Sequence, residues 1–254
     1  MPIIKPPGDN VTALISSSGG KDSILALERG RWDGLQVSTI LMMFDEDGER
    51  SRSHGIAPTV ARAQADAIGC QLVMPRASWS TYESVFVASL TQLKMSGHDQ
   101  AIFGDIDLQP HRDWEEMVCE RAGLTPVLPL WGQDRVALAN EILESGIEAV
   151  VVCVDSRKLG DEFVGRRYDR SFLADLPDGV DQCGENGEFH TFVTNSRLFA
   201  YRLRVEVTGH RPFVAPAEFG GTRFCFADLK LLQSRAQPIR DFRKPARRRN
   251  VGPR

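Results

Sequence analysis

The chain has 254 residues and is 42% hydrophobic, which is enough for one large or two small domain cores. Its net charge of −3 argues against a nucleic-acid-binding protein that works through bulk charge. No apolar run is long enough to cross a bilayer, residues 1–7 lack the apolar core of a signal peptide, and the five cysteines form no C-x-x-C pair, so we expect a reduced, cytoplasmic protein without a membrane partner or structural zinc.

Predicted strands and helices alternate along the first half of the chain. Their apolar patterns indicate strands at residues 11–15, 37–44, 70–74 and 99–106, and helices at residues 24–29, 58–68, 81–95 and 114–121. Gly30 is predicted to end the first helix, as glycine often does. This alternation predicts an α/β fold, with a Rossmann-like (HUP-type), mostly parallel sheet covered by helices on both faces.

An apolar stretch interrupted by prolines, from Pro126 to Trp131, is predicted to connect two domains. Beyond it we expect a smaller α+β domain, with a helix at residues 134–145, strands at residues 147–154, 201–208 and 222–226, and short helical turns between residues 163 and 173. The predicted organisation is an N-terminal arm (1–10), a first domain (11–130), a second domain (131–239) and a basic tail (240–254). The Arg, Lys and Pro content of that tail predicts disorder.

The segment from Ser16 to Ser23, with the sequence SSSGGKDS, stands between the first predicted strand and the first predicted helix. Its glycines allow the backbone to approach a phosphate, and the unpaired N–H groups at the start of the helix point toward such an anion. Serine hydroxyls and the Lys21 ammonium add further donors. The spacing fits neither a Walker loop nor the G-x-G-x-x-G dinucleotide fingerprint. The alternative is an ordinary Ser/Gly turn with a helix cap.

The stretch Ser18-Gly19-Gly20-Lys21-Asp22-Ser23 resembles the pyrophosphate loop of the N-type ATP pyrophosphatases, which cleave ATP between the α and β phosphates and adenylate an acceptor. The resemblance implies ATP and Mg2+ as cofactors. The residues expected at the cofactor are Ser16, Ser18, Gly19, Gly20, Lys21, Asp22, Ser23, Met42 and Gly104, with Asp22 and Asp105 as metal ligands. Met42 and Asp105 stand at the ends of predicted strands, where open α/β sheets bind their ligands. Core packing of Met42, a helix cap at Asp22 and a plain turn at Asp105 are the alternatives.

A second dense motif, CGENGEFHT from Cys183 to Thr191, narrows the resemblance. Together with His54-Gly55-Ile56, Gln64-Ala65 and the segment from Gly104 to Trp131, it makes the chain similar to the diphthine–ammonia ligase family over about residues 11 to 200. In that family the first domain binds ATP and the second carries the acceptor site. The enzyme joins ammonia to a carboxylate of a modified histidine on elongation factor two, through an acyl-adenylate.

The resemblance implies a role for most residues of both motifs. The predicted catalytic residues are Lys21, Asp105, Glu185 and Glu188, and the predicted acceptor-binding residues are Cys183, Gly184, Glu185, Asn186, Gly187, Glu188, His190 and Thr191. Lys21 would hold phosphate oxygens, and the two glutamates would bind ammonium or accept its proton. A solvated turn is the alternative for the glutamates. A Cys183 nucleophile is a weak hypothesis, His54 is expected to be structural, and the histidines lack the spacing of a zinc site.

The second motif departs from the Glu-Gly-Gly-Glu-(Tyr/Phe)-Glu-Thr pattern of the eukaryotic and archaeal enzymes, because Asn186 replaces a glycine and His190 replaces a glutamate. The variant looks like a bacterial-type member. We therefore expect a small-molecule or modified-residue carboxylate acceptor other than diphthine, since a protonated His190 would oppose the trimethylammonium cation of diphthine. Nucleic acid is not expected as a partner, and a homodimer is left open.

Two other functions remain open at this point. The same loop occurs in tRNA-modifying and thiolation enzymes, which usually show sulfur-relay cysteine pairs or a basic tRNA-binding domain. A nucleotide-binding sensor of the universal-stress type would use the same sheet without a ligase step, but with a different glycine spacing and no second-domain motif. The products formed from ATP would separate the three.

Overall fold

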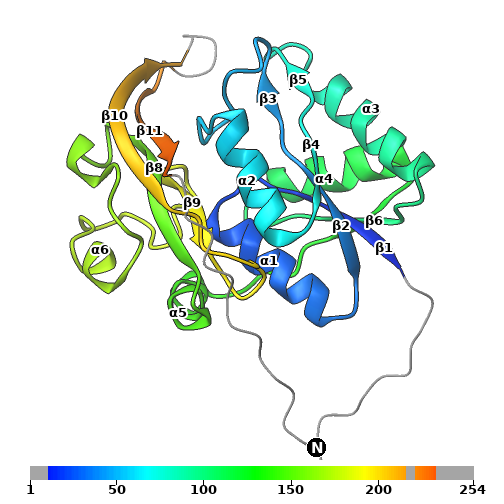
Figure 1. Cartoon of the computed structure of the whole chain (residues 1–254), viewed down its shortest axis with the longest axis horizontal. Coiled ribbons are helices and arrows are strands. Elements are labelled where there is room, and N and C mark those ends of the chain that lie inside the picture. Colours follow the sequence, from blue (N-terminus) through cyan, green and yellow to red (C-terminus); the bar gives the residue numbers. More distant parts are fainter. Residues whose placement is uncertain (1–10, 216–220, 233–254) are drawn as a thin grey trace, which may run out of the picture.

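The computed structural model describes residues 11–215 and 221–232, so the predicted N-terminal arm and basic tail lie outside the described residues. Two sheets form its framework (Figure 1). The first contains five strands in the order β4-β2-β1-β6-β7, and all neighbouring strands in it pair in parallel. Its strands are β1 (Thr12–Ser16), β2 (Gln36–Leu41), β4 (Gln71–Val73), β6 (Gln100–Ile102) and β7 (Thr125–Val127).

Helices cover both faces of this parallel sheet, as the alternating pattern predicts. They are α1 (Lys21–Trp32), α2 (Pro58–Ile68), α3 (Tyr82–Met95) and α4 (Gln109–Ala122). One core packs α1 and α2 against one face, and a second core packs α3 and α4 against the other. The short strands β3 (Phe44–Asp45) and β5 (Arg76–Ala77) form a separate parallel pair. The predicted Rossmann-like α/β fold is therefore confirmed.

The second sheet is antiparallel and follows the first in the chain. It has the order β10-β11-β8-β9, with β8 (Glu148–Asp155), β9 (Phe189–Asn195), β10 (Val205–Val214) and β11 (Arg223–Leu231). The remaining elements are α5 (Arg135–Ser145), a 3-10 turn (Asp161–Phe163) and α6 (Arg170–Ala174). Helices α1 and α2 lie between the two sheets (Figure 1), and residues of β8, β9 and β11 share their core. The predicted smaller α+β part is confirmed, whereas the boundary at residues 130/131 stays a prediction.

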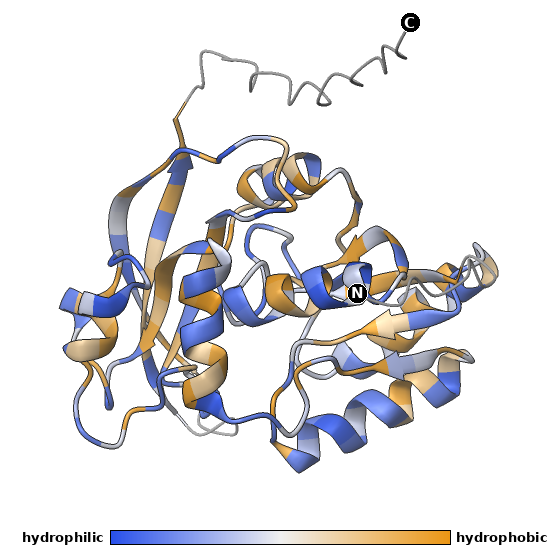
Figure 2. Cartoon of the chain, turned by 90° about the horizontal axis from the view of Figure 1, so that it is seen from below, coloured by the Kyte–Doolittle hydropathy of each residue, from blue (hydrophilic) through white to orange (hydrophobic). Residues whose placement is uncertain are grey.

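The helices carry both polar and apolar residues (Figure 2), and their apolar residues pack into the two cores beside the parallel sheet. Strand β1 lies at the centre of its sheet, and its residues Ala13, Leu14 and Ile15 are fully buried. A strand buried on both faces needs such a continuous apolar run. Among the described residues, we find no helix that is long and apolar enough to cross a membrane.

Several predicted boundaries were wrong, each for a local reason. Gly30 does not end α1; it lies inside the helix, where a Cβ atom would stand 2.6 Å from the Ile102 side chain, so the glycine allows close packing on β6. The predicted strand at residues 37–44 is divided, because β2 ends at Leu41 and Phe44 begins the separate strand β3. The first two residues of the predicted connector, Pro126 and Val127, belong to the edge strand β7, where proline is tolerated.

Other predicted elements were shifted or missed. The strand predicted at residues 99–106 ends at Ile102, and the helix predicted at 114–121 begins earlier, with Pro110 in its first turn. The strands predicted at 201–208 and 222–226 correspond to β10 and β11, which run several residues further. Strand β9 was not predicted, because its polar neighbours in the second motif favoured a turn.

Candidate functional site

A pocket of about 920 Å3 opens at the carboxyl ends of β1, β2 and β6, which is where open α/β sheets bind their ligands. Both sequence motifs contribute to its wall. Of the predicted site residues, the lining includes Ser16, Ser18, Lys21, Asp22, Ser23, Met42, Gly104, Asp105, Cys183, Gly184, Glu185, Asn186, Gly187, His190 and Thr191. Gly19, Gly20 and Glu188 are not part of this lining. The fold therefore brings two motifs together that are 160 residues apart in the sequence.

The two loop glycines are required by packing against the second sheet. Gly19 has a φ of +80°, and a Cβ atom there would lie 2.8 Å from Oε1 of Gln64 and 3.2 Å from the ring of Phe192. A Cβ atom on Gly20 would lie 3.1 Å from Nε2 of His54. The sequence predicted that these glycines let the backbone approach a phosphate, but in the structure the close neighbours are protein groups.

Hydrogen bonds tie this loop directly to β9. The Val193 N–H donates to the Gly19 carbonyl at 2.9 Å, and the Lys21 N–H donates to Oγ1 of Thr191 at 3.1 Å. Gln64 is fully buried, and its Nε2 donates both to the Gly19 carbonyl at 3.0 Å and to the Val193 carbonyl at 2.7 Å. The second sheet is thus a structural part of the loop site.

Lys21 is the most deeply buried cation of the pocket, with 2% of its side chain exposed. Its Nζ donates to Oδ2 of Asp22 at 2.8 Å and to the carbonyl of Cys183 in the second motif. Burial disfavours the charged ammonium, but Asp22, Cys183 and Glu185 together outweigh the effect of burial and raise the pKa of Lys21. For Asp22 the effect of burial is larger than the opposing effect of Lys21, so the pKa of Asp22 is raised. Lys21 therefore bridges the two motifs.

Asp22 is not the helix cap that its position left open as an alternative to a metal ligand. Gly20 occupies the N-cap position of α1, and no side chain caps this end. Besides the oxygen that accepts from Lys21, Asp22 has a second oxygen, Oδ1, which is buried and has no hydrogen-bond partner among the described residues. That oxygen remains available as a ligand.

Gly104 and Asp105 follow β6 and meet the start of α1. A Cβ atom on Gly104 would lie 2.8 Å from the backbone nitrogen of Ser23, so only glycine fits this approach. Oδ1 of Asp105 lies 2.7 Å from Nδ1 of His111. Burial would raise the pKa of Asp105, but hydrogen bonds with His111 and Glu115 lower it overall. Asp105 is therefore a carboxylate held by His111 and Glu115 of α4, and not a free turn residue.

Glu115, which the sequence analysis did not single out, is buried in the wall beside Asp105, with 4% of its surface exposed. Burial and the hydrogen bond with Asp105 raise the pKa of Glu115 to about 11, so it is protonated at neutral pH. The pair thus carries one negative charge between two carboxyl groups. Neither spacing nor composition signals this pair, because α4 turns Glu115 back toward the loop before the helix.

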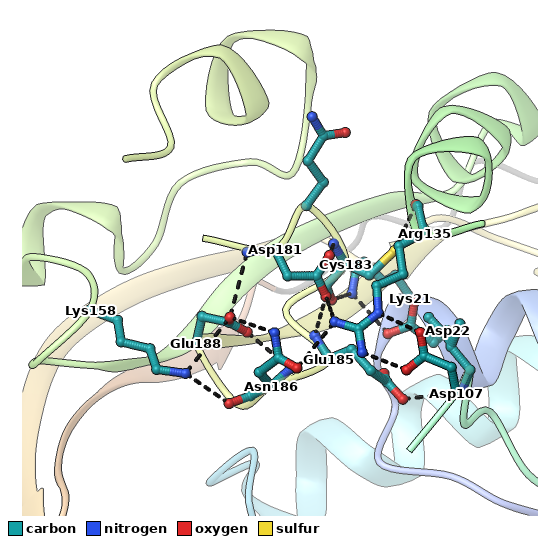
Figure 3. A network of polar contacts seen from close by, with 12 residues as sticks. Lys21, Asp22, Asp107, Arg135, Lys158, Asp181, Cys183, Glu185, Asn186 and Glu188 are labelled. Atoms are coloured by element: carbon teal, nitrogen blue, oxygen red, sulfur yellow. Dashed lines mark hydrogen bonds and ion pairs between the residues drawn. The ribbon is translucent and has the colours of Figure 1, made fainter. Parts of the chain in front are cut away.

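The two glutamates of the second motif lie in different surroundings (Figure 3). Glu185 lines the pocket, and its Oε1 accepts the Ile106 N–H at 3.0 Å. Burial raises the pKa of Glu185 to about 7. Glu188 is 2% exposed, and its carboxylate accepts the backbone N–H and the side-chain amide of Asn186, both at 3.0 Å. A solvated turn is the wrong description of Glu188, which holds the turn from beneath.

The rings of His190 and His54 lie side by side in the pocket wall, with centroids 4.5 Å apart and planes tilted by 40°. Burial and the nearby Lys21 lower the pKa of His190 to about 4, and burial together with His190 lowers the pKa of His54 well below its usual value. Both rings are therefore neutral at physiological pH. The expectation that a protonated His190 would repel a cationic acceptor is wrong.

The five cysteines are free and buried. Cys183 donates its thiol to the carbonyl of Arg135 at 3.1 Å, and burial raises the pKa of the thiol to about 12. A thiol in that state is a poor nucleophile.

Among the described residues, no group of three or more His, Cys, Asp or Glu side chains is placed to hold a metal ion.

Part of the pocket wall consists of aromatic side chains from α3 and α4. The ring centroids of Phe86 and Trp114 are 5.0 Å apart, and those of Tyr82 and Trp114 are 6.0 Å apart. Arg52 also lines the pocket and lies over the ring of Trp79. No function was predicted for the aromatic residues of α3 and α4, because apolar residues at helical spacing usually belong to a core.

Two protein-family models match successive parts of the chain, and together they include both motifs that line the pocket. The diphthamide synthase N-terminal domain matches residues 10–126, and the diphthamide synthase C-terminal domain matches residues 134–215. A diphthine–ammonia ligase of Danio rerio is 34% identical over 98 residues, which cover 37% of this chain and 38% of that protein. The Bos taurus ligase is 30% identical over 135 residues, which cover 50% and 49%.

The ligase of Schizosaccharomyces pombe is 26% identical over 209 residues, which cover 73% of this chain and 34% of that protein. The chain thus spans between about a third and a half of the length of these curated relatives. A solved structure described as a predicted subunit of tRNA methyltransferase from Methanocaldococcus jannaschii covers 74% of this chain and 98% of its own, with 14% identity and a TM-score of 0.40. Because both domain models match in order and together cover most of its length, the chain belongs to the diphthamide synthase family.

Proposed function

We propose that this protein is an ATP-dependent ligase that adenylates a carboxylate, releases pyrophosphate and forms an amide with ammonia. One observation supports this most strongly. The loop from Ser16 to Ser23 and the motif from Cys183 to Thr191 line the same pocket, and Lys21 contacts both. The curated relatives named diphthine–ammonia ligase support the same reaction class. A nucleotide and its acceptor would therefore meet at one place.

In this proposal the phosphates of ATP lie at the start of α1. The helix dipole and the first N–H groups favour negative charge there, and the serine hydroxyls add donors. Lys21 exchanges its bond to the Cys183 carbonyl for a phosphate oxygen and stabilises the charge that develops on the departing pyrophosphate. The strand end from Leu41 to Met43 forms an apolar wall on the same side, which suits the adenine ring.

Mg2+ would accompany ATP and balance phosphate charge. Magnesium in such sites is usually held by one or two carboxylates together with phosphate oxygens, so a cluster made of protein ligands alone is not needed. The buried, unbonded Oδ1 of Asp22 fits this role. Asp105 fits less well, because His111 and Glu115 already hold its carboxylate.

The chemistry has two balanced steps. An acceptor carboxylate oxygen attacks the α-phosphorus, and the bond to the bridging oxygen breaks, so that pyrophosphate leaves. Ammonia then attacks the acyl carbon, the bond to AMP breaks, and a proton passes from nitrogen to a base. Glu185 suits that base, because it lines the pocket and its pKa of about 7 is close to the operating pH. For Glu188, which was also predicted as catalytic, we propose a supporting role, because it accepts two hydrogen bonds from Asn186 and lies outside the pocket lining.

For the acceptor we propose a small-molecule or modified-residue carboxylate other than diphthine. The neutral His190 removes a negative charge that the family pattern places beside the acceptor, and this weakens the attraction for a fixed trimethylammonium cation. The Asn186 amide is already bound by protein groups, because it donates to Glu188 and accepts from Arg135 at 3.1 Å. The acceptor preference therefore depends on His190.

The test offers the protein ATP, magnesium and ammonium, together with either diphthine-bearing elongation factor or a bacterial extract of small carboxylic acids. We expect ammonium-dependent AMP with the extract, and little diphthamide with the elongation factor. Efficient conversion of diphthine would refute the acceptor proposal and leave the ligase proposal intact. The absence of AMP with every acceptor would refute the ligase proposal.

A thiolation enzyme finds no support at the site, because Cys183 is buried with a raised thiol pKa and no second cysteine lines the pocket. A sensor without catalysis would not need a base such as Glu185 beside the phosphate loop. AMP formation that requires a sulfur donor in place of ammonium would favour the thiolation enzyme, and no ATP turnover at all would favour the sensor.

A further inference from the structure

Three segments that are distant in the sequence meet at the first residue of α5, Arg135 (Figure 3). Its guanidinium donates through Nε to Oδ2 of Asp107 at 2.8 Å, in the loop after β6. It also donates through Nη1 to Oδ2 of Asp181 at 3.0 Å, two residues before the second motif, and to Oδ1 of Asn186 at 3.1 Å, inside that motif. Arg135 therefore links the ATP-binding half to the acceptor motif, although it does not line the pocket.

Asp181 transmits this contact to the residues that do line the pocket. Its Oδ2 accepts the Glu185 N–H at 2.8 Å, and its Oδ1 accepts the Cys183 N–H at 3.1 Å. Glu185 is held at its other end by the Ile106 N–H, one residue before Asp107. Arg135 therefore holds the two segments that contact Glu185. One is the loop after β6, whose Ile106 N–H donates to the Glu185 carboxylate, and the other is the segment that begins at Asp181, which accepts the Glu185 N–H.

We propose that Arg135 is the positioning residue that holds Glu185 in the pocket, beside the phosphate loop. This inference rests on the proposed ligase function for its kinetic consequences, but the contacts themselves do not depend on it. Arginine suits the task, because its planar fork places donors on two carboxylates at once, whereas a lysine ammonium acts as a single charged point. The pair with Asp181, whose side chain is 10% exposed, is better shielded from solvent than the pair with Asp107, whose side chain is 38% exposed.

The chain provides a matched control in Arg29. Its side chain is also 23% exposed, and its guanidinium also joins two parts of the chain. It donates to Glu141 of α5, at 3.2 Å through Nε, and to the Pro129 carbonyl at 2.9 Å. Within the part of the chain that the structure describes, the side-chain contacts of Arg29 are with Glu141, Pro129 and Gln133, and none reaches the second motif. A loss that reflects general destabilisation would therefore appear equally in Arg29→Lys.

The first measurement is hydrogen exchange of the free full-length protein, followed by mass spectrometry. We expect Arg135→Lys to speed exchange at least tenfold in peptides that contain residues 105–109 and 181–188, and Arg29→Lys to leave both unchanged. The second is ammonium-dependent AMP formation with the small-molecule extract. There we expect Arg135→Lys to lower kcat about a hundredfold while the KM for ATP changes less than threefold, because Arg135 does not touch the loop from Ser16 to Ser23.

Unchanged exchange at 181–188, or a kcat no lower than that of Arg29→Lys, would overturn the proposal. If the wild type forms no AMP, the proposed function fails, and the exchange result still decides whether Arg135 holds the motif. If Arg135→Lys does not fold, Asp107→Asn replaces it, because that change removes one partner of the guanidinium at an exposed position. It should loosen the same two segments to a smaller extent.

Discussion

Gln64 provides a sharp test of how the phosphate loop is held. Its amide is buried between α2 and β9, and one nitrogen donates to the carbonyls of Gly19 and Val193 at 3.0 and 2.7 Å. The change Gln64→Ala removes both bonds and leaves a cavity beneath the loop. Gly19 keeps a donor, the Val193 N–H at 2.9 Å, but the Val193 carbonyl loses its side-chain donor.

The magnitude follows from these contacts. Each lost hydrogen bond costs about 1 kcal/mol, and a buried carbonyl left without its partner costs roughly 1–3 kcal/mol. We therefore expect the free energy of unfolding to fall by about 3 kcal/mol, a large fraction of a typical total of about 5–15 kcal/mol. With an m-value of about 3 kcal/mol/M, the urea midpoint should decrease by about 1 M.

The assay is urea unfolding followed by circular dichroism. The matched control is Gln92→Ala, which removes the same side chain from an exposed position on α3 and should change the free energy of unfolding by less than about 0.5 kcal/mol. A Gln64→Ala protein as stable as this control would refute the view that the buried amide joins the loop to β9.

Three further predictions concern the pocket. Lys21→Ala should lower AMP formation by about a hundredfold or more, because it removes the charge beside the departing pyrophosphate; full activity measured in the same assay would contradict this. Gly104→Ala should lower the free energy of unfolding by about 1–3 kcal/mol, because its Cβ would lie 2.8 Å from the backbone of Ser23, and thermal melting would show whether it does. A Glu185 base must be ionised, so turnover per free ammonia should rise about tenfold per pH unit below its pKa of about 7 and level off above it. Glu185→Gln should abolish this rise, and a rise that persisted in the variant would exclude Glu185 as the base.

Local pattern predicted the parts of this protein that depend on local chemistry. Alternating apolar segments indicated the parallel sheet, and the spacing from Ser18 to Ser23 placed the loop between a strand and a helix. Because the carboxyl ends of parallel strands share one edge, the loop, Met42 and Asp105 were expected on the same side of the sheet. The structure places all three in one pocket.

Contacts over long sequence distances could not be predicted in this way. The turn-like composition around Gly187 concealed that Glu188 is buried and that β9 begins directly after it. Arg135 looked like an ordinary first residue of a helix, and its three partners lie 28 to 51 residues away. The charge of His190 depends on burial beside Lys21, which only the packed structure reveals.

The proposed acyl-adenylate can be tested most directly with a carboxylate acceptor that carries oxygen-18 in its carboxyl group. In the proposed reaction an acceptor oxygen attacks the α-phosphorus and remains there when ammonia displaces AMP. Mass spectrometry should therefore find one oxygen-18 atom in AMP for each amide formed. Amide formation that yields ADP and labelled inorganic phosphate, or AMP without the label, would contradict the account.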